Sequence, residues 1–321
     1  IHPLTSPAEI LRYPHLTLIE KARLGLLTLR SRQLDAPALD GITAKEFILD
    51  NLGPGIYASF FEPLLKSKFG DRREEVSAAW LISRIAIRSD RGAGGERLGY
   101  LRGGFRHFVA RLEEEAAKRG ASIMPDSPVR EIRREGDGWL VDGEVYDCVV
   151  STLPPQVTAD LAGLDIAPVP YQGAACMTLA LDRDVTDGIY WLNMKDAAPY
   201  GAVVSHTNFA PFEWYGEHIV YLASYFSGRL PEGLEQSMLA DFCRRFFVSP
   251  DEVHWHRLAV DPHAGPVYTT GLRSRLPAYE EHGLFLAGMF SPPNYPERSM
   301  NGSVVAGKEA AKRVLARYPD A

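Results

Sequence analysis

The stretch that most constrains the fold of this 321-residue chain is residues 283–315, where an apolar run, a glycine, a polar loop and a helix follow one another. Residues 284–287 read Leu-Phe-Leu-Ala, a run of strand length, and Gly288 ends it. A helical pattern begins at Asn301 or Gly302. A glycine permits close backbone approach, and the free amides of a helix N-terminus attract anions. The pattern predicts an anion-binding turn, although a plain surface turn of an α/β protein has the same form.

The same stretch resembles the C-terminal flavin-binding motif of the FAD-dependent amine oxidase and protoporphyrinogen oxidase superfamily. The similarity lies in Leu286-Ala-Gly-Met289, Tyr295-Pro-Glu-Arg298 and Asn301-Gly302, and it is greatest to a bacterial branch of that superfamily. Many members carry an acidic residue after the glycine, on the ribityl or pyrophosphate side of FAD, and this chain departs from that pattern with Met289. The resemblance implies FAD contacts, with Arg298 helping to neutralise the pyrophosphate. The residues implied are Val129, Gly288, Met289, Arg298, Asn301, Gly302 and Ser303.

Two further stretches resemble the same superfamily, in the same order along the chain. Residues 98–112 are similar to its Gly-Gly turn before a helix that returns to the flavin domain. Gly103 and Gly104 allow a tight entry, and an apolar stripe at helical spacing follows, formed by Phe105, Phe108, Val109 and Leu112. Residues 61–70 and 76–80 are similar to a helical segment of its substrate domain.

One expected element is missing from the sequence. Members of this superfamily begin with a strand, a Gly-x-Gly-x-x-Gly turn and a helix, followed by an acidic residue for the ribose. This chain has no such turn, and its glycine cluster at residues 92–95 follows a charged run, which indicates a loop. We therefore expect the chain to be a fragment without this N-terminal βαβ unit; a two-chain enzyme and a protein that has lost FAD are the alternatives. As a fragment it should bind FAD poorly.

The pattern of the remaining residues predicts alternating helical and sheet regions. Capping boxes at Thr17 and Thr43 open helices in a mostly helical N-terminal part, the first with Leu18, Ala22, Leu26 and Leu29 on one side. A helix is predicted for 231–247. Strands are predicted at 121–124, 129–132, 139–141, 145–153, 174–181, 189–193, 201–206, 219–226 and 253–260.

Composition limits the class of protein. A hydrophobic content of 45%, a net charge of −6 and a pI near 5.9 are typical of a globular chain and argue against nucleic acid as the main partner. No apolar run reaches membrane-spanning length. Three dispersed cysteines suggest reduced, buried thiols and a cytoplasmic location.

Several side chains are candidates for chemistry, each with a simpler interpretation. Lys66 and Lys68 match a segment that holds a lysine near the flavin in related oxidases, but a solvated helix face with a Glu62–Lys66 pair explains them as well. Tyr100 and Arg102 flank the entry to the flavin domain, where loop packing is the alternative. Tyr268 resembles a position near the substrate cavity and is otherwise an ordinary strand residue.

Two other groups of residues are weaker candidates. His254 and His256 share a strand face, yet no further ligands accompany them, so we expect no metal site. Five arginines crowd one region, namely Arg88, Arg91, Arg97, Arg102 and Arg106, and they suggest either a nucleotide-sugar site or a charged surface.

These observations together predict an α/β fold in which an incomplete Rossmann-like FAD domain alternates with a helical-plus-antiparallel-sheet substrate domain. The expected segments are residues 1–97, 98–156, 157–278 and 279–321, with the second and fourth belonging to the FAD domain. The implied activity is hydride transfer from a small organic substrate, at an amine, C–N or C–C bond, to FAD. A redox-neutral sugar-nucleotide mutase and a non-catalytic relative without FAD are the alternatives. The oligomeric state stays open.

Overall fold

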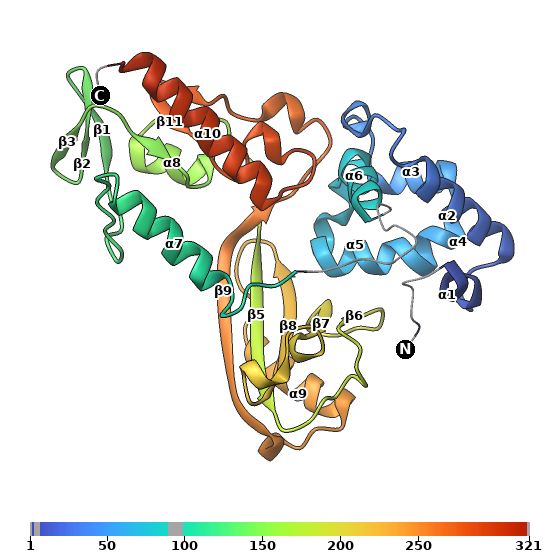
Figure 1. The fold of residues 1–321 in the computed structure, drawn as a ribbon. Helices are drawn as coiled ribbons and strands as arrows, with labels where there is room; N and C mark the ends of the chain where they lie inside the picture. The colour runs from blue at the N-terminus through green and yellow to red at the C-terminus, as the bar shows by residue number, and fades with distance from the viewer. Residues whose placement is uncertain (1, 3–6, 89–98, 320–321) are drawn as a thin grey trace.

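The computed structural model describes residues 2, 7–88 and 99–319, and Figure 1 shows three groups of elements. The first group is helical and comes from the N-terminal part of the chain. Its helices are α1 (Pro7–Arg12), α2 (Leu18–Arg30), α3 (Ala44–Asn51), α4 (Pro54–Ile56), α5 (Glu62–Phe69) and α6 (Ala78–Arg88). The predicted capping boxes at Thr17 and Thr43 are both present, so the sequence located these helix starts correctly.

The buried face of α2 differs from the prediction. Leu24 and Leu27 are the buried residues of this helix, whereas Leu18 and Leu29 are more than 70% exposed. The helix carries apolar residues on two sides, and helical spacing alone cannot tell which side meets the core.

The second group contains a small parallel sheet and is built from two separate parts of the chain. Its strands β4 (Val150–Ser151) and β11 (Leu284–Leu286) pair in parallel, and β10 (Glu280–Glu281) pairs antiparallel with β11. Helix α10 (Met300–Arg317) packs on this sheet through the buried residues Gly302, Ala306 and Ala310. The other members are α7 (Phe105–Ala117), β1 (Ile132–Glu135), β2 (Gly138–Val141), β3 (Glu144–Tyr146) and α8 (Pro155–Ala162).

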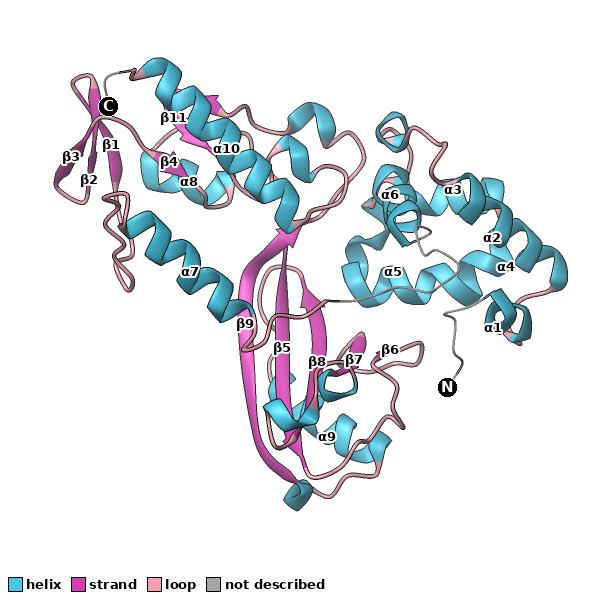
Figure 2. Cartoon of the chain, in the orientation of Figure 1, coloured by secondary structure: helices cyan, strands magenta, loops and turns pink. Residues whose placement is uncertain are grey.

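The third group is an antiparallel sheet with the order β6-β7-β8-β5-β9. Its strands are β5 (Tyr171–Leu181), β6 (Trp191–Asn193), β7 (Ala202–Ser205), β8 (His218–Phe226) and β9 (Val253–Pro266), and α9 (Leu234–Phe246) accompanies them. Figure 2 shows β5 and β9 extending from this sheet towards the second group. Helix α9 buries Leu234, Met238 and Phe242 against the sheet, as its spacing predicted.

Backbone hydrogen bonds join the N-terminal helices to the C-terminal part of the chain. The Ser77 amide donates to the Tyr268 carbonyl at 2.8 Å, and the Gly271 amide donates to the Asp40 carbonyl at 3.0 Å. One continuous core contains side chains from both regions, including Phe61, Val267 and Leu286. The architecture is therefore α/β with a helical part and an antiparallel sheet, as predicted. The segment boundaries at 97, 156 and 278 stay predictions.

Three predicted strands near α7 are wrong or displaced. Residues 121–124 are exposed and form no strand, because among the described residues no neighbouring strand pairs with them. The strand expected at 129–132 is β1, which begins at Ile132, and the run 145–153 is split into β3 and β4. Strand formation requires a hydrogen-bonded neighbour, which a local apolar pattern does not reveal.

Candidate functional site

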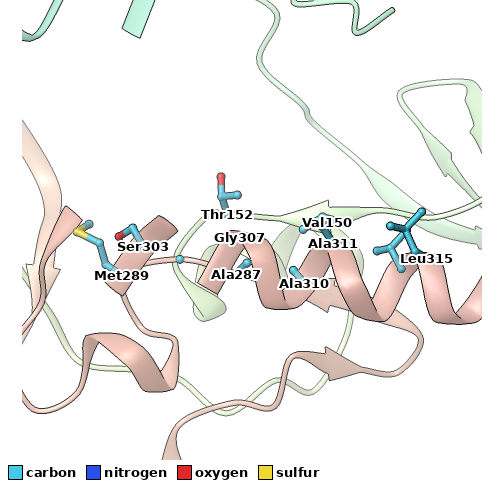
Figure 3. A pocket seen from close by; sticks show the side chains of 11 residues that line it. Val150, Thr152, Ala287, Met289, Ser303, Gly307, Ala310, Ala311 and Leu315 are labelled. Carbon is cyan, nitrogen blue, oxygen red and sulfur yellow. The ribbon is translucent and has the colours of Figure 1, made fainter. Parts of the chain in front are cut away.

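A groove of about 680 Å³ lies where β4 and β11 end beside α10. Figure 3 shows its lining residues along one side of α10, from Met289 and Ser303 at one end to Leu315 at the other. The carboxyl ends of parallel strands are the usual place for nucleotide ligands in α/β proteins. The lining residues are Val150, Thr152, Ala287, Gly288, Met289, Ser303, Gly307, Ala310, Ala311, Val314 and Leu315.

The two glycines of the predicted motif are explained by contacts within the chain. A Cβ atom on Gly288 would lie 2.7 Å from the Phe290 ring and 3.1 Å from the Thr152 carbonyl oxygen. A Cβ atom on Gly302 would overlap the Asn294 side chain and lie 2.8 Å from the Pro293 carbonyl oxygen. Both positions therefore require glycine whether or not a cofactor is bound.

The loop between β11 and α10 is held in one shape by buried Asn294. Its side-chain amide donates to the Gly288 carbonyl at 3.1 Å, and its Oδ1 accepts from the Ser299 amide at 2.9 Å. The Ser299 hydroxyl in turn accepts from the Gly302 amide at 2.9 Å and so caps α10. The amide of Ser303 donates to the Ser299 carbonyl, so neither predicted anion-binding amide, Gly302 nor Ser303, is free.

Tyr268 is part of the support beneath this loop. Its side chain is buried, and its hydroxyl donates to the Asn294 carbonyl at 2.7 Å. Burial raises the pKa of the Tyr268 phenol strongly, with the Glu297 carboxylate adding to the effect, so the phenol stays neutral. This arrangement gives Tyr268 a structural role in positioning the loop.

The other predicted cofactor contacts lie at different places. Arg298 is half-buried, with its guanidinium against Gly265 of β9, and it is absent from the groove lining. Asn301 is exposed in the first turn of α10, and Val129 is exposed in the segment before β1. The structure thus brings Gly288, Met289 and Ser303 together.

The two lysine candidates lie on α5 in the helical group. Lys66 is exposed, and Lys68 places its ammonium 4.7 Å from the centre of the Trp80 ring. The carboxylate of Glu62 approaches Arg73 Nε at 4.0 Å. Neither lysine lines the groove, so the structure supports packing and surface roles for both.

Tyr100 and Arg102 both contact the sheet group just before α7 begins. The Tyr100 ring lies edge-on to the His206 ring with centroids 4.9 Å apart, and the Arg102 guanidinium lies 5.9 Å from the centre of the Trp214 ring. Gly103 and Gly104 have φ angles of 80° and 76°, which confirms the tight turn predicted there.

A cluster of aromatic side chains around His206 was missed by the sequence analysis. His206 is buried, and its Nε2 lies 2.8 Å from the Tyr215 hydroxyl. The Tyr221 ring lies 5.3 Å from the imidazole, and burial raises the pKa of Tyr221 to about 12. Burial also lowers the pKa of His206, which keeps its ring neutral. These residues come from separate segments with no motif spacing, so only the tertiary structure reveals the cluster.

The histidine pair on β9 contacts carboxylates of other segments. His254 lies between the carboxylates of Glu217 and Asp182, at 2.7 Å and 3.0 Å, whereas His256 pairs with Glu235 at 3.4 Å. Among the residues that the structure describes, no group of three or more potential ligands could hold a metal ion. All three cysteines are free and half-buried, so the expectation of thiols holds, but they are less buried than predicted.

The donor set of the groove fits one end of a flavin nucleotide. Gly288, Met289 and Ser303 offer an apolar and weakly polar lining suited to a flat ring or a ribityl chain. A pyrophosphate needs several converging backbone amides or cations, and the groove lining contains no charged side chain.

Comparisons with known proteins agree with this interpretation. The family model described as flavin containing amine oxidoreductase matches residues 1–315. A solved structure from Exiguobacterium sp. 255-15, provisionally described as a protoporphyrinogen oxidase, is 19% identical, with a TM-score of 0.72 over 98% of this chain and 75% of that one. An oxidoreductase from Methanosarcina mazei is 18% identical, with a TM-score of 0.65 over 93% of this chain and 73% of that one.

A more distant likeness is to a reduced UDP-galactopyranose mutase, at 14% identity and a TM-score of 0.59 over 81% of this chain and 63% of that one. At these identities the solved structures establish the fold alone. No curated protein matches the chain. Across the described part of the chain, no helix has the length and apolar character needed to cross a membrane.

Proposed function

Because the chain belongs to the flavin containing amine oxidoreductase family, we propose that it is part of an FAD-dependent oxidoreductase that oxidises a small organic substrate. The observation that carries the proposal is the family match over residues 1–315, which includes the strand, glycine, loop and capped helix beside the groove. The bond that is oxidised is a C–N bond, such as that of an amine, or a C–C bond. The protein would act in the cytoplasm.

The bound flavin would supply the hydride acceptor, and the chain's own residues would position and shield it. Met289 and Ser303 line one end of the groove, where they would contact the flavin. Asn294 and Tyr268 keep the loop in place from below. Arg298, Asn301 and Gly302 belong to the same loop and first helical turn as these residues, and we include them among the proposed cofactor contacts.

The cluster around His206 is the surface that we assign to substrate. Tyr100, Tyr215 and Tyr221 surround the neutral imidazole, and all three phenols are partly accessible. Aromatic faces bind planar or apolar substrates, and the phenol hydroxyls offer hydrogen bonds that orient them.

The direct test is the visible absorption spectrum of the gene product purified from its own host, followed by chromatography of the released cofactor. We expect a flavin spectrum, FAD as the released species, and bleaching on anaerobic addition of an oxidisable substrate. Residues 1–321 expressed alone should bind FAD weakly, since no Gly-x-Gly-x-x-Gly turn is present. A colourless native protein would contradict the proposal and favour the non-catalytic relative.

The mutase alternative has its own signature. Such an isomerase would act on a nucleotide sugar only after reduction of the flavin and would consume no oxidant. Of the arginine cluster that suggests such a site, Arg91 and Arg97 lie outside the described residues. Arg102 and Arg106 are exposed. Product formation from a nucleotide sugar by the reduced protein alone would replace the oxidoreductase proposal.

A further inference from the structure

A second cavity, of about 430 Å³, lies where three segments that are far apart in the sequence meet. Pro37 comes from the helical group, residues 273 and 276–278 follow β9, and Pro292 and Tyr295 belong to the loop between β11 and α10. None of its lining residues lines the groove beside α10, so this cavity is separate from the proposed flavin site.

Asp40 holds the three segments together beside this cavity. Its carboxylate accepts hydrogen bonds from the Tyr295 hydroxyl and from the Arg273 backbone amide, the latter at 3.3 Å. Its backbone carbonyl accepts from the Gly271 amide at 3.0 Å. Burial raises the pKa of the Tyr295 phenol, and the hydrogen bond to Asp40 adds to the effect, so the phenol stays neutral and donates to Asp40. The walls are therefore fixed in place without a ligand.

Two arginines of one short segment near the cavity have different surroundings. Arg275 donates three side-chain hydrogen bonds to residues 269–271, at 3.1–3.2 Å. Among the described residues, Arg273 makes its hydrogen bond through the backbone amide, and no carboxylate pairs with its guanidinium. Arg273 is also the one charged side chain in the cavity lining. A guanidinium without a carboxylate partner is available to an anionic ligand.

Three prolines make the walls of the cavity rigid and apolar. Pro37, Pro277 and Pro292 have no backbone N–H to offer a ligand, and Leu276 and Ala278 add apolar side chains. Proline rings pack well against flat aromatic groups, as in the recognition of proline-rich segments. A phosphate group needs several converging donors, which prolines cannot supply. The planar fork of a single guanidinium instead matches the two oxygens of one carboxylate.

We propose that this cavity binds a small carboxylate with a flat apolar body, held by Arg273 and packed against the three prolines. Arg273 is exposed, so the charged end of the ligand would stay near solvent while its ring enters the cavity. The carboxylate would accept two parallel hydrogen bonds from the guanidinium. The inference rests on the cavity alone and does not depend on the proposed oxidation.

The loop between β11 and α10 contributes to both this cavity and the groove. Pro292 and Tyr295 line the cavity, whereas Asn294 between them bonds the Gly288 carbonyl and the Ser299 amide through its side chain. A ligand packed on Pro292 and Tyr295 would restrict the backbone that carries Asn294. Occupation of the cavity should therefore slow the opening of the hydrogen bonds that shape the loop.

Calorimetric titration of the purified protein tests the charge and the shape of the ligand. The probes are 2-naphthoate, its uncharged amide 2-naphthamide and the cation 2-naphthylmethylamine, which share one flat ring system. We expect 2-naphthoate to bind saturably at one site, roughly ten-fold more tightly than the amide, and more weakly as salt is added. The cation should not bind. Equal affinities for 2-naphthoate and 2-naphthamide, or no saturable binding of 2-naphthoate, would overturn the proposal.

Substitutions at exposed positions locate the site. Arg273→Gln should lower the affinity for 2-naphthoate roughly ten-fold and leave the affinity for 2-naphthamide unchanged. Arg229→Gln is the matched control, because Arg229 is exposed in the loop after β8 and is absent from the cavity lining. Ala278→Phe should fill the cavity and block both probes. An equal loss of affinity in the two arginine variants would contradict a site at Arg273.

Hydrogen exchange with and without 2-naphthoate tests the effect on the loop. Exchange at the Ser299 amide should slow several-fold when the probe is bound, while exchange in α9 stays unchanged. Protection of other segments, without protection of residues 271–278 and 292–299, would place the probe elsewhere and overturn the proposal. These measurements need no flavin, so a failure of the proposed oxidation would leave their outcome unchanged.

Discussion

At the scale of single residues, two glycines of α10 have opposite surroundings. A Cβ on Gly302 would overlap Asn294, whose side chain holds the loop between β11 and α10, whereas nothing lies within 4 Å of a Cβ on Gly307. We expect Gly302→Ala to destabilise the protein by about 1–3 kcal/mol, because the backbone of the loop must move. Gly307→Ala should instead stabilise it by about 0.5–1 kcal/mol, because alanine loses less entropy in a helix.

Urea denaturation of residues 1–321 and the two variants measures this difference in the free energy of unfolding. The two substitutions are chemically identical and lie in one helix, so each serves as the control for the other. If both substitutions changed the free energy of unfolding by the same amount, the loop would not pack against Gly302 through Asn294.

Two histidines should titrate on opposite sides of the ordinary value of about 6.5. Hydrogen bonds to Glu217 and Asp182 raise the pKa of His254, whereas burial lowers the pKa of His206. The His254 contribution to stability is present below pH 6.5 and is lost as pH rises through its raised pKa. The His206 contribution is present above pH 6.5 and is lost as pH falls through its lowered pKa.

Nuclear magnetic resonance titration of the imidazole signals checks the two directions, with His254→Gln and His206→Asn assigning the peaks. Thermal melting across the same pH range should show that the His254→Gln effect shrinks at alkaline pH. The His206→Asn effect should shrink at acid pH. A shared midpoint for both rings would contradict the different environments.

At the scale of elements, α7 is a helix of 13 residues without a buried side chain. Isolated helices of about 12–15 residues are marginal in water, so α7 should open often in residues 1–321 alone. We expect its amides to exchange hydrogen for deuterium on the order of 100-fold faster than those of α9, which has a buried face. Equally slow exchange in both helices of a monomeric sample would show that α7 is stable without a covering element.

The elements also show what a sequence can predict. Both capping boxes and the buried face of α9 were predictable, because these signals are local and each pattern has one interpretation. The strand expected at residues 121–124 is wrong, because a local apolar pattern does not show whether a neighbouring strand is there to pair with it, and none of the described strands does. The prediction for α2 is wrong for a similar reason. The helix has apolar residues on two sides, and only tertiary packing decides which side is buried.

The sequence likewise predicted the part of the candidate site that lies in one local motif and missed the part that folding assembles. The groove brings together Gly288, Met289 and Ser303, which lie in one local motif and could be found from sequence. Only folding brings together His206, Tyr215 and Tyr100, so no spacing in the sequence indicates this cluster. Arg298 illustrates a different difficulty. Its place in the motif predicts a cofactor contact, whereas in the structure its side chain packs on Gly265.

At the scale of the whole molecule, the described residues form two apolar cores. One lies between the antiparallel sheet and α9, and the other joins the N-terminal helices to the C-terminal segment. Phe242→Ala removes a fully buried ring from the first core and should destabilise it by about 3–5 kcal/mol. Hydrogen exchange should then rise in β5, β8 and α9, while α3 and α6 keep the protection of the unchanged protein.

Phe69→Ala is the matched variant, because it removes a buried ring from the second core and should give the reverse pattern. If either substitution raised exchange everywhere by the same factor, the two cores would unfold as one cooperative unit.

The antiparallel sheet narrows at Gly173. Strand β8 ends its pairing opposite Gly173, so beyond that point only β5 and β9 continue, and their register shifts between Gln172 and Ala174. Only these two strands, with a bulge, run past this point, and Arg298 of the loop between β11 and α10 rests against them at Gly265. Any side chain larger than hydrogen at residue 265 would displace the Arg298 guanidinium, so the strand and the loop cannot change independently here.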